Sequence, residues 1–344
     1  MKRKPYIKKN RFYNTKDEKL EGFFFKSLSM LLKSLFVRKK LSKAEKDVWS
    51  CRVKPLSYSV EPVITWLGHA SFLIQVGGVN IITDPIFGQM SRLYPRCLHA
   101  ALNGAELPNI DFVLISHNHR DHMDAESLMS LQGHSGITFL VPQGDKLWFE
   151  GRSFARVREY SWWDNVSFKL KYDLSKEIKF TFLPAKHWSQ RGLFDRNKSL
   201  WGSWMIECNG QKIYFAGDTS YHSHFSEISQ EFRNIDIALM PIGPCEPREW
   251  IKHTHLNVSD AGKAFVDLRA KHFVPMHWGA FPLGVECYDA PILLFKKWWK
   301  EHALELQNKK LHVLKVGQQA KLDLVPFQLK EPVKESVISS QRQL

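Results

Sequence analysis

The sequence predicts an α/β fold in which two facing β-sheets are covered by helices. The main observation is a pair of tight hairpins. SFLIQVGGVNIITD (71–84) has two apolar runs joined by Gly-Gly, and WMIECNGQKIYFAGD (204–218) has two runs joined by Asn-Gly. These dipeptides are typical of the two-residue turns that connect antiparallel strands.

The second observation is that the pattern around the hairpins repeats. Each hairpin ends on an aspartate, Asp84 or Asp218, at an offset of 134 residues. NIDFVLISH follows the first hairpin and NIDIALMPI follows the second, 125 residues later. This repeat indicates two half-domains of one plan. Helical patterns at 125–131 and 259–269 would cover the sheets.

The positive charge of the chain is concentrated at its N-terminus. The net charge is +14, and residues 1–54 contain 17 Lys and Arg against 5 Asp and Glu. The remaining 290 residues therefore carry a net charge of only +2. Nucleic-acid binding by the body is not expected, because it requires a basic footprint on the folded domain.

The N-terminal arm contains an amphipathic segment, GFFFKSLSMLLKSLFVRKK (22–40). On a helical wheel, Lys26, Ser29 and Lys33 oppose an apolar side formed by Phe24, Phe25, Leu28, Leu31, Leu32, Leu35 and Phe36. Two interpretations are open: a helix that docks on the protein's own core, or a helix that lies in an anionic membrane surface, where the flanking cations would stabilise binding.

Cysteine usage and hydropathy limit the location of the chain. The five cysteines are scattered, odd in number and without a CxxC pair, so neither a disulfide framework nor a cysteine zinc site is expected. The N-terminus lacks the apolar run of a signal peptide, and no stretch reaches the roughly 18 apolar residues of a membrane span. The cytoplasm is the expected location, with peripheral membrane attachment if the arm binds lipid.

Potential metal ligands follow four predicted strands. FVLIS leads to HNHRDH, and FTFLPA, KIYFAG and HFVPM lead to three further ligands. The residues are His117, His119, Asp121, His122, His187, Asp218 and His277. Sites are commonly built at strand ends because rigid sheets aim the loops that follow them.

Imidazole and carboxylate donors without cysteine suit zinc or a similar divalent ion, and their number exceeds the need of one tetrahedral centre. Two metals that activate a shared water for hydrolysis are expected.

These motifs carry a family resemblance. HNHRDH resembles the HxHxDH signature of the metallo-β-lactamase superfamily, whose fold is an αββα sandwich with a dinuclear metal site. The chain also resembles the N-acylphosphatidylethanolamine-hydrolysing phospholipase D family. The resemblance lies in TWLGHASFLI (65–74), TDPIFG (83–88), HWSQRGLFDRNKSLWGSWMI (187–206), FAGDTSY (215–221), PIGPCEPREW (241–250) and MHWGAF (276–281).

The resemblance implies a role for each site residue. One metal would be held by His117, His119 and His187, a second by Asp121, His122 and His277, and both by Asp218. Asp121, Asp218 and His255 would be catalytic, while Arg120 and His255 would contact substrate. A solvated loop position for His255 remains open. Asp84 and Asp124 would either orient imidazoles or cap turns.

The implied reaction is hydrolysis of an N-acylated phosphatidylethanolamine to phosphatidic acid and an N-acylethanolamine, with two divalent ions, expected to be Zn²⁺. Arg120 stands where an aromatic residue is usual, which favours an anionic head group. The alternative is a metal-dependent lactonase or another soluble hydrolase of a small phosphorylated substrate. A noncatalytic lipid-binding protein of the same fold is a third hypothesis, disfavoured by the complete ligand set.

The predicted organisation is a basic arm over residues 1–59, a metallo-β-lactamase-type domain over 60–326 and a polar, disordered tail over 327–344. The expected partners are a phospholipid substrate and an anionic membrane surface. A homodimer is left open.

Overall fold

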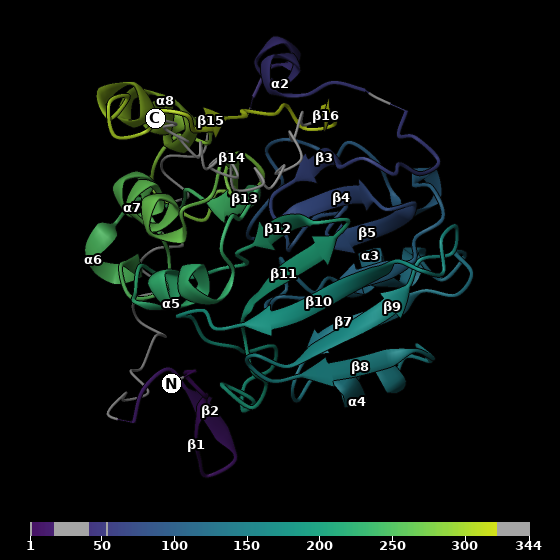
Figure 1. Cartoon of the computed structure of the whole chain (residues 1–344). Coiled ribbons are helices and arrows are strands. Elements are labelled where there is room, and N and C mark those ends of the chain that lie inside the picture. Colours follow the sequence, from purple (N-terminus) through teal and green to yellow (C-terminus); the bar gives the residue numbers. More distant parts are fainter. Residues whose placement is uncertain (1, 17–40, 53, 322–344) are drawn as a thin grey trace, which may run out of the picture.

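Two seven-stranded sheets pack face to face, as the repeated hairpins predict (Figure 1). The computed structural model describes residues 2–16, 41–52 and 54–321. The first sheet has the order β16-β3-β4-β5-β6-β7-β8. Its strands are β3 (Val63–Gly68), β4 (Ser71–Val76), β5 (Val79–Thr83), β6 (Phe112–Leu114), β7 (Thr138–Pro142), β8 (Val157–Tyr160) and β16 (Gln319–Lys321).

The second sheet has the order β15-β14-β13-β12-β11-β10-β9. Its strands are β9 (Asn165–Lys169), β10 (Glu177–Leu183), β11 (Ser203–Cys208), β12 (Gln211–Phe215), β13 (Ile237–Pro241), β14 (His272–Met276) and β15 (Lys310–Leu311). Side chains from both sheets, such as Phe72, Ile74, Phe180 and Trp204, form one buried core between them.

The two sheets have the same plan of pairing. From β16 to β8, three antiparallel pairs are followed by three parallel pairs. From β9 to β15 the order is again three antiparallel pairs and then three parallel pairs. The predicted hairpins are β4–β5 and β11–β12, and they occupy equivalent places. The duplication inferred from sequence is therefore confirmed at the level of topology.

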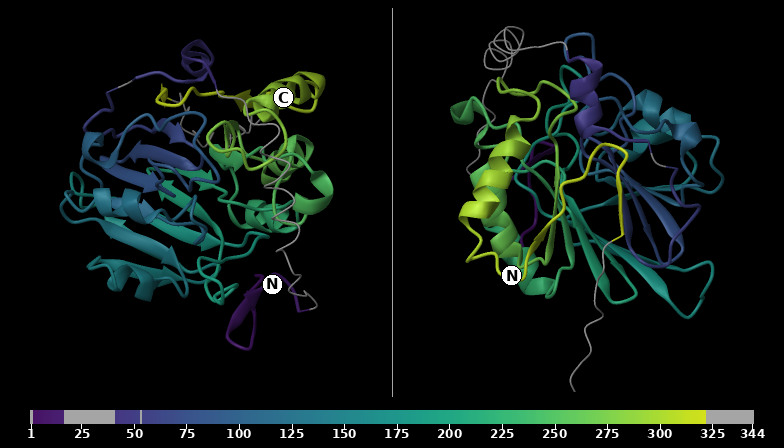
Figure 2. Two further views of the ribbon diagram at one scale, coloured as in Figure 1. Left: turned by 180° about the vertical axis from the view of Figure 1, so that it is seen from behind. Right: turned by 90° about the horizontal axis from the view of Figure 1, so that it is seen from above.

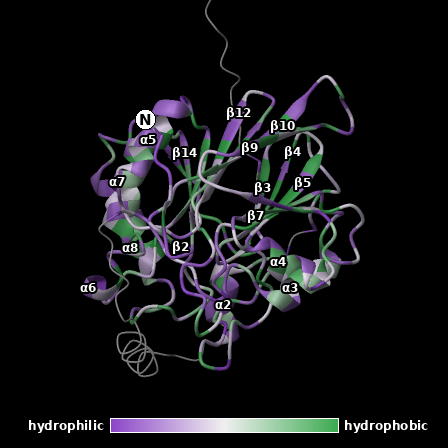
Figure 3. Cartoon of the chain, turned by 90° about the horizontal axis from the view of Figure 1, so that it is seen from below, coloured by the Kyte–Doolittle hydropathy of each residue, from purple (hydrophilic) through white to green (hydrophobic). Residues whose placement is uncertain are grey.

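Helices cover the outer faces of both sheets, which completes an αββα sandwich (Figure 2). The predicted helices at 125–131 and 259–269 are α3 (Ala125–Ser130) and α7 (Val258–Leu268). The other helical elements are α2 (Lys43–Trp49), η1 (Gly104–Glu106), α4 (Lys146–Glu150), α5 (His224–Glu231), α6 (Arg248–Ile251) and α8 (Ala290–Glu301). Polar and apolar residues alternate along α7 and α8, as expected for helices with one buried face (Figure 3).

The first residues of the chain form a small hairpin of β1 (Tyr6–Lys8) and β2 (Arg11–Tyr13) below the second sheet. Phe12 is buried, and its N–H donates to Asn197 O at 2.8 Å. Further toward the N-terminus, Arg3 pairs with Glu227 of α5 at 2.8 Å. Residues 2–16 are thus packed on the body of the protein.

Two predicted segments lie outside the described residues: the amphipathic helix at 22–40 and the tail at 327–344. The boundary between residues 59 and 60 stays a prediction. Among the described helices, none is long and apolar enough to cross a membrane.

Candidate metal centre

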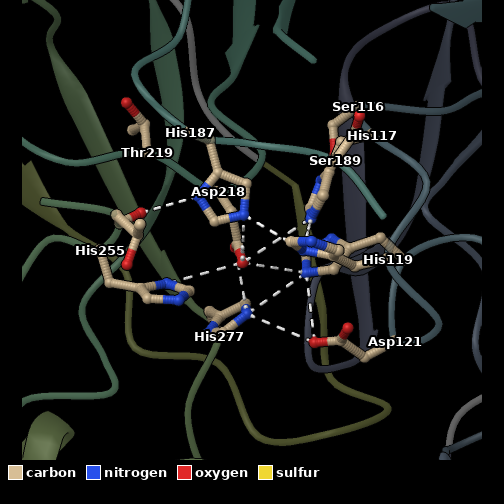
Figure 4. A network of polar contacts seen from close by, with 12 residues as sticks. Ser116, His117, His119, Asp121, His187, Ser189, Asp218, Thr219, His255 and His277 are labelled. Carbon is tan, nitrogen blue, oxygen red and sulfur yellow. Dashed lines mark hydrogen bonds and ion pairs between the residues drawn. The ribbon is translucent and has the colours of Figure 1, made fainter. Parts of the chain in front are cut away.

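The turns that follow strands of both sheets meet at one edge of the sandwich (Figure 4). HNHRDH follows β6 of the first sheet. His187, Asp218 and His277 follow β10, β12 and β14 of the second sheet. The seven residues predicted as metal ligands are therefore brought together from both halves, and they form groups whose ligand atoms could hold metal ions.

Three imidazoles form the first group. His117 Nε2 lies 2.9 Å from His119 Nδ1, and His187 Nε2 lies 3.2 Å from the same atom. Ligands held about 2.0–2.1 Å from zinc in tetrahedral geometry are roughly 3.4 Å apart, close to these spacings.

The second group contains Asp121, His122 and His277, as predicted, together with His69. His122 Nε2 and His277 Nε2 lie 3.5 and 3.8 Å from Asp121 Oδ2. His69 Nε2 lies 2.9 Å from the same oxygen. At this distance the His69 ring donates to the carboxylate and orients it.

Asp218 lies between the two groups. Its Oδ2 is 4.0 Å from His117 Nε2 and 3.8 Å from His187 Nε2 in the first group. In the second group, Oδ2 is 3.3 Å from His122 Nε2 and Oδ1 is 3.0 Å from His277 Nε2. One carboxylate thus faces every imidazole of the predicted ligand set except His119.

The hydrogen bonds of the imidazoles leave their lone pairs directed inward. His187 Nδ1 donates to Thr254 O at 2.8 Å, and His277 Nδ1 donates to Gly243 O at 3.0 Å. In the neutral form of a ring that donates through Nδ1, the Nε2 atom is an acceptor. For His277, this acceptor faces Asp218 Oδ1, which itself has no hydrogen-bond partner. Such a nitrogen and a carboxylate oxygen 3.0 Å apart attract each other when a proton or a metal ion lies between them, so the donor set fits a metal.

Asp84 orients two of these rings: that of His122 by a direct hydrogen bond and that of His117 through Ser116. Its Oδ2 accepts from His122 Nδ1 at 2.7 Å and from Ser116 Oγ at 2.5 Å, and its Oδ1 accepts from Ser116 N–H at 2.7 Å. Because the Ser116 hydroxyl donates to Asp84, its oxygen accepts from His117 Nδ1 at 2.9 Å. A carboxylate that orients ligand imidazoles is a usual part of a metal centre.

Asp124 has the other of the two roles predicted for it. Its carboxylate accepts from Ser127 N–H at 2.9 Å and from Ser127 Oγ at 2.6 Å, which caps the N-terminus of α3. It orients none of the site imidazoles by a described hydrogen bond. Of the two roles that the sequence left open for Asp124, its described hydrogen bonds show the helix cap.

Burial makes most of the imidazoles neutral at neutral pH. It lowers the pKa of His69 and His187 to about 3 and that of His119 to about 4. Burial would raise the pKa values of Asp121 and Asp218, but His122 beside both carboxylates holds them well below their usual range. His122 is the exception among the buried rings, because Asp218 and Asp121 raise its pKa above the usual value despite burial. Neutral imidazoles and ionised carboxylates are the forms that bind metals.

The two residues predicted to contact substrate lie in different environments. His255 is not a solvated loop residue: its Nδ1 is 3.6 Å from Asp218 Oδ2, and only 18% of its side chain is exposed. Arg120 is exposed between two ligand residues, and its Nη2 lies 3.4 Å from Arg191 O.

Sequence reasoning missed His69 and Asn14. His69 occupies the tight turn between β3 and β4, within the quoted TWLGHASFLI motif. It shares a positive φ with two other site residues, at 55° for His69, 32° for Asp84 and 61° for His277. Non-glycine residues in this conformation concentrate at functional sites, where the surroundings hold them in place. A histidine in a turn between two apolar runs was the available signal for His69.

Asn14 comes from the other end of the chain. Its Nδ2 donates to His187 O at 2.9 Å, and its Oδ1 accepts from His187 N–H at 3.3 Å. Nothing in the local sequence around residue 14 indicates this contact.

Comparison with known proteins agrees with this geometry. Residues 79–278 match the family model described as "Beta-lactamase superfamily domain". The chain is 32% identical over 236 residues to an N-acyl-phosphatidylethanolamine-hydrolyzing phospholipase D of Caenorhabditis elegans, with 65% of each chain covered. It is 35% identical over 234 residues to a mitochondrial protein of that name from Saccharomyces cerevisiae, with 66% of this chain and 49% of the relative covered. The match thus spans less than two thirds of either relative.

Among solved structures, Igni18, a metallo hydrolase of Ignicoccus hospitalis, superimposes with a TM-score of 0.57 at 24% identity, covering 77% of this chain and 99% of Igni18. This likeness supports the fold alone. The resemblance to the phospholipase D family expected from the motifs is confirmed by the curated relatives, and the family match covers more than half of the residues. The chain belongs to the metallo-β-lactamase superfamily.

Proposed function

We propose that the chain is a metal-dependent phosphodiesterase that hydrolyses N-acylated phosphatidylethanolamine to phosphatidic acid and an N-acylethanolamine. The observation that carries the proposal is the position of Asp218 between two groups of ligand atoms. This arrangement suits two metals and an in-line displacement at phosphorus. The names of the two phospholipase D relatives support the lipid substrate.

The proposed ligands divide as the two groups do. His117, His119 and His187 would hold one ion, and Asp121, His122 and His277 the other, with Asp218 shared. The metals, which we propose to be Zn²⁺, would activate a water near neutral pH and neutralise charge on the phosphate.

The protein groups around the metals have separate tasks in this proposal. His69 and Asp84 would hold Asp121 and His122 in place through the hydrogen bonds described above. Burial lowers the pKa of His255 to about 3, so its ring is neutral and would donate an N–H hydrogen bond to the departing ethanolamine oxygen. The guanidinium of Arg120 would bind the anionic head group.

An apolar cavity of about 670 Å³ supports a substrate with hydrocarbon chains. Its wall includes His277, and apolar side chains around it come from α2 and from the segment after β14: Trp49, Trp278, Phe281 and Leu283. We propose that this cavity accepts an acyl chain, because apolar surface of this kind binds hydrocarbon without polar partners.

The decisive experiment combines metal analysis with a product assay. Purified protein should contain about two equivalents of divalent metal and should release N-acylethanolamine from N-acylated phosphatidylethanolamine in vesicles. Asp218→Asn should lose metal and turnover while its circular dichroism spectrum stays unchanged. A phosphorylated lactone serves as the competing substrate: turnover of this compound without lipid hydrolysis would replace the phospholipase assignment with the lactonase.

The amphipathic segment 22–40 is proposed to bind anionic membrane, which would make the protein a peripheral membrane protein of the cytoplasm. Deleting the arm is a poor test, because residues 2–16 also contact the metal centre through Asn14. Replacing Leu28, Leu32 and Leu35 by serine in the full chain is sharper, and loss of sedimentation with phosphatidylserine vesicles is expected.

A further inference from the structure

The loop after His187 displays two large apolar side chains to solvent. Leu193 is 85% exposed and the adjacent Phe194 is 82% exposed. Among the described residues, Leu147 at 80% and Leu304 at 85% are the other large apolar residues of comparable exposure, and neither is adjacent in sequence to a second one. Adjacent large apolar side chains on a solvent-exposed surface commonly mark an interaction site.

The exposure of this tip is built into the loop. Asn197 N–H donates to Ser189 O at 2.7 Å, which closes the base of the loop. Within it, the Asp195 carboxylate accepts from Gly192 N–H at 2.8 Å and from Arg191 N–H at 3.2 Å. Leu193 and Phe194 are therefore held at the tip of a hydrogen-bonded turn.

Cations surround the tip. The segments 6–13 and 188–198 contain six Lys and Arg and a single carboxylate, Asp195. Arg11 donates to the carbonyl oxygens of Arg196 and of Phe194, the latter at 3.2 Å, so hairpin β1–β2 borders the loop directly. Lys8 pairs with Arg11 across the hairpin, which places both side chains on one face. The surface is apolar at its tip and positive around it.

The same loop is connected to the proposed metal centre. It begins at His187, and the Trp188 ring packs edge-on against His119 with centroids 4.3 Å apart. The Arg196 guanidinium lies over Trp188 at 4.9 Å. Arg120, from the ligand motif itself, contacts the main chain of the loop at Arg191. Whatever binds the loop is consequently held beside the metal residues.

We propose that this loop and hairpin form a docking face for an anionic lipid bilayer, defined by Lys8, Lys9, Arg11, Leu193, Phe194 and Arg196. Leu193 and Phe194 would enter the interface, while the exposed Lys8 and Lys9 would contact lipid phosphates. The inference rests on the proposed lipid substrate and adds where the bilayer is met. It is separate from the segment 22–40, because its residues belong to the described body.

A fluorophore at the tip tests the location of binding. Phe194→Cys is labelled with an environment-sensitive dye in a Cys287→Ser background, which removes the exposed native cysteine. Leu304→Cys is the matched control, since Leu304 is similarly exposed and comes directly after α8, which lies on the opposite side of the molecule from hairpin β1–β2 in Figure 1. With phosphatidylcholine vesicles that contain phosphatidylserine, the emission at position 194 should shift to the blue and the emission at 304 should not. An unchanged emission at 194, or equal shifts at both positions, would overturn the docking face.

A kinetic comparison links docking to turnover. Leu193→Ser combined with Phe194→Ser should lower hydrolysis of vesicle substrate at least about tenfold, because burial of two large apolar side chains is lost. Hydrolysis of a small water-soluble phosphodiester should remain at the wild-type rate, and Leu304→Ser should change neither. Equal vesicle turnover in both variants would refute the inference. A blue shift at position 194 without any lipid product would support the docking face and refute the proposed reaction instead.

Discussion

Asn14 contacts both main-chain polar groups of His187, although the two residues are 173 positions apart in the chain. Asn14 Oδ1 also accepts a hydrogen bond from Trp201 Nε1 at 3.1 Å. The N-terminal hairpin is therefore a support for one proposed metal ligand. Since His187 Nδ1 is held from the other side by Thr254 O, the ring is fixed between two segments.

Asn14→Ala should lower metal affinity about tenfold, the usual effect of losing a group that orients a ligand. It should also lower the free energy of unfolding by about 1–3 kcal/mol, since His187 N–H and C=O stay buried without this partner. Chelator competition and urea unfolding measure the two effects. Asn165→Ala, at an exposed asparagine of β9, is the control and should change neither. Wild-type metal affinity in Asn14→Ala would show that Asn14 does not position the ligand.

Asp84 and Asp124 form a natural pair for testing which carboxylate serves the metal centre. Asp84→Ala should lower metal affinity by about 10- to 100-fold, because His122 Nδ1 and Ser116 Oγ lose their acceptor. Asp124→Ala should leave metal affinity unchanged and cost about 1 kcal/mol of stability through the lost cap on α3. Isothermal titration with zinc and urea unfolding separate these outcomes. Similar losses of affinity in both variants would contradict the assignment.

The elements of the fold were predictable where the signal is local. Gly-Gly and Asn-Gly pairs mark the β4–β5 and β11–β12 turns, and apolar runs of four to six residues mark the central strands. The repeat of these signals predicted two sheets of one plan. The clustering of the candidate ligands was predictable for the same reason, because HNHRDH, His187, Asp218 and His277 each follow an apolar run.

The remaining parts depend on contacts between distant segments. Asn14 follows a short polar hairpin and shows its role only when it lies against the loop after β10. Asp84 and Asp124 both border motif residues, and only the folded chain shows that one faces imidazoles and the other a helix N-terminus. His69 is a single histidine in the turn between β3 and β4. It donates a hydrogen bond to Asp121, which lies in the loop after β6, so this role is visible only in the folded chain.

Gly217 follows β12 of the second sheet and lies against Ser116, which follows β6 of the first sheet. A Cβ at this residue would lie 2.5 Å from Ser116 Cβ, and its φ is +59°. Gly210 has a similar φ of +77° with no atom near its Cβ position, so it controls for backbone strain. Gly210→Ala should cost about 1 kcal/mol. Gly217→Ala should cost more and should also lower metal affinity, because the new methyl group displaces Ser116 from Asp84 and His117.

Urea unfolding and zinc titration of both glycine variants measure these effects. The comparison isolates the contact with Ser116, since the strain of a left-handed alanine is common to the two variants. Equal stability and equal zinc affinity in Gly210→Ala and Gly217→Ala would mean that Ser116 can move without disturbing the metal residues.

A pair of histidines remote from the metal centre should make stability depend on pH. His272 Nδ1 and His312 Nε2 are 2.7 Å apart, with Lys271, Lys310 and Asp236 around them. Burial and the neighbouring His312 lower the pKa of His272 to about 4, and burial followed by Lys310 lowers that of His312. An unfolded histidine has a pKa of about 6.5, so between pH 6.5 and pH 4 the unfolded chain binds more protons than the folded chain.

Stability should therefore fall as the pH drops through this range, by at most about 1.4 kcal/mol per pH unit for each such proton. Replacing His272 by Asn and His312 by Gln removes both titrating groups and should flatten this dependence. Urea unfolding at several pH values gives the slope for each protein, and NMR titration of the His272 ring gives its pKa directly. The histidines of the metal centre contribute to the slope in both proteins, so the difference between the two slopes reports on this pair alone. Identical slopes, or a His272 pKa near 6.5, would show that folding does not disfavour the protonated ring.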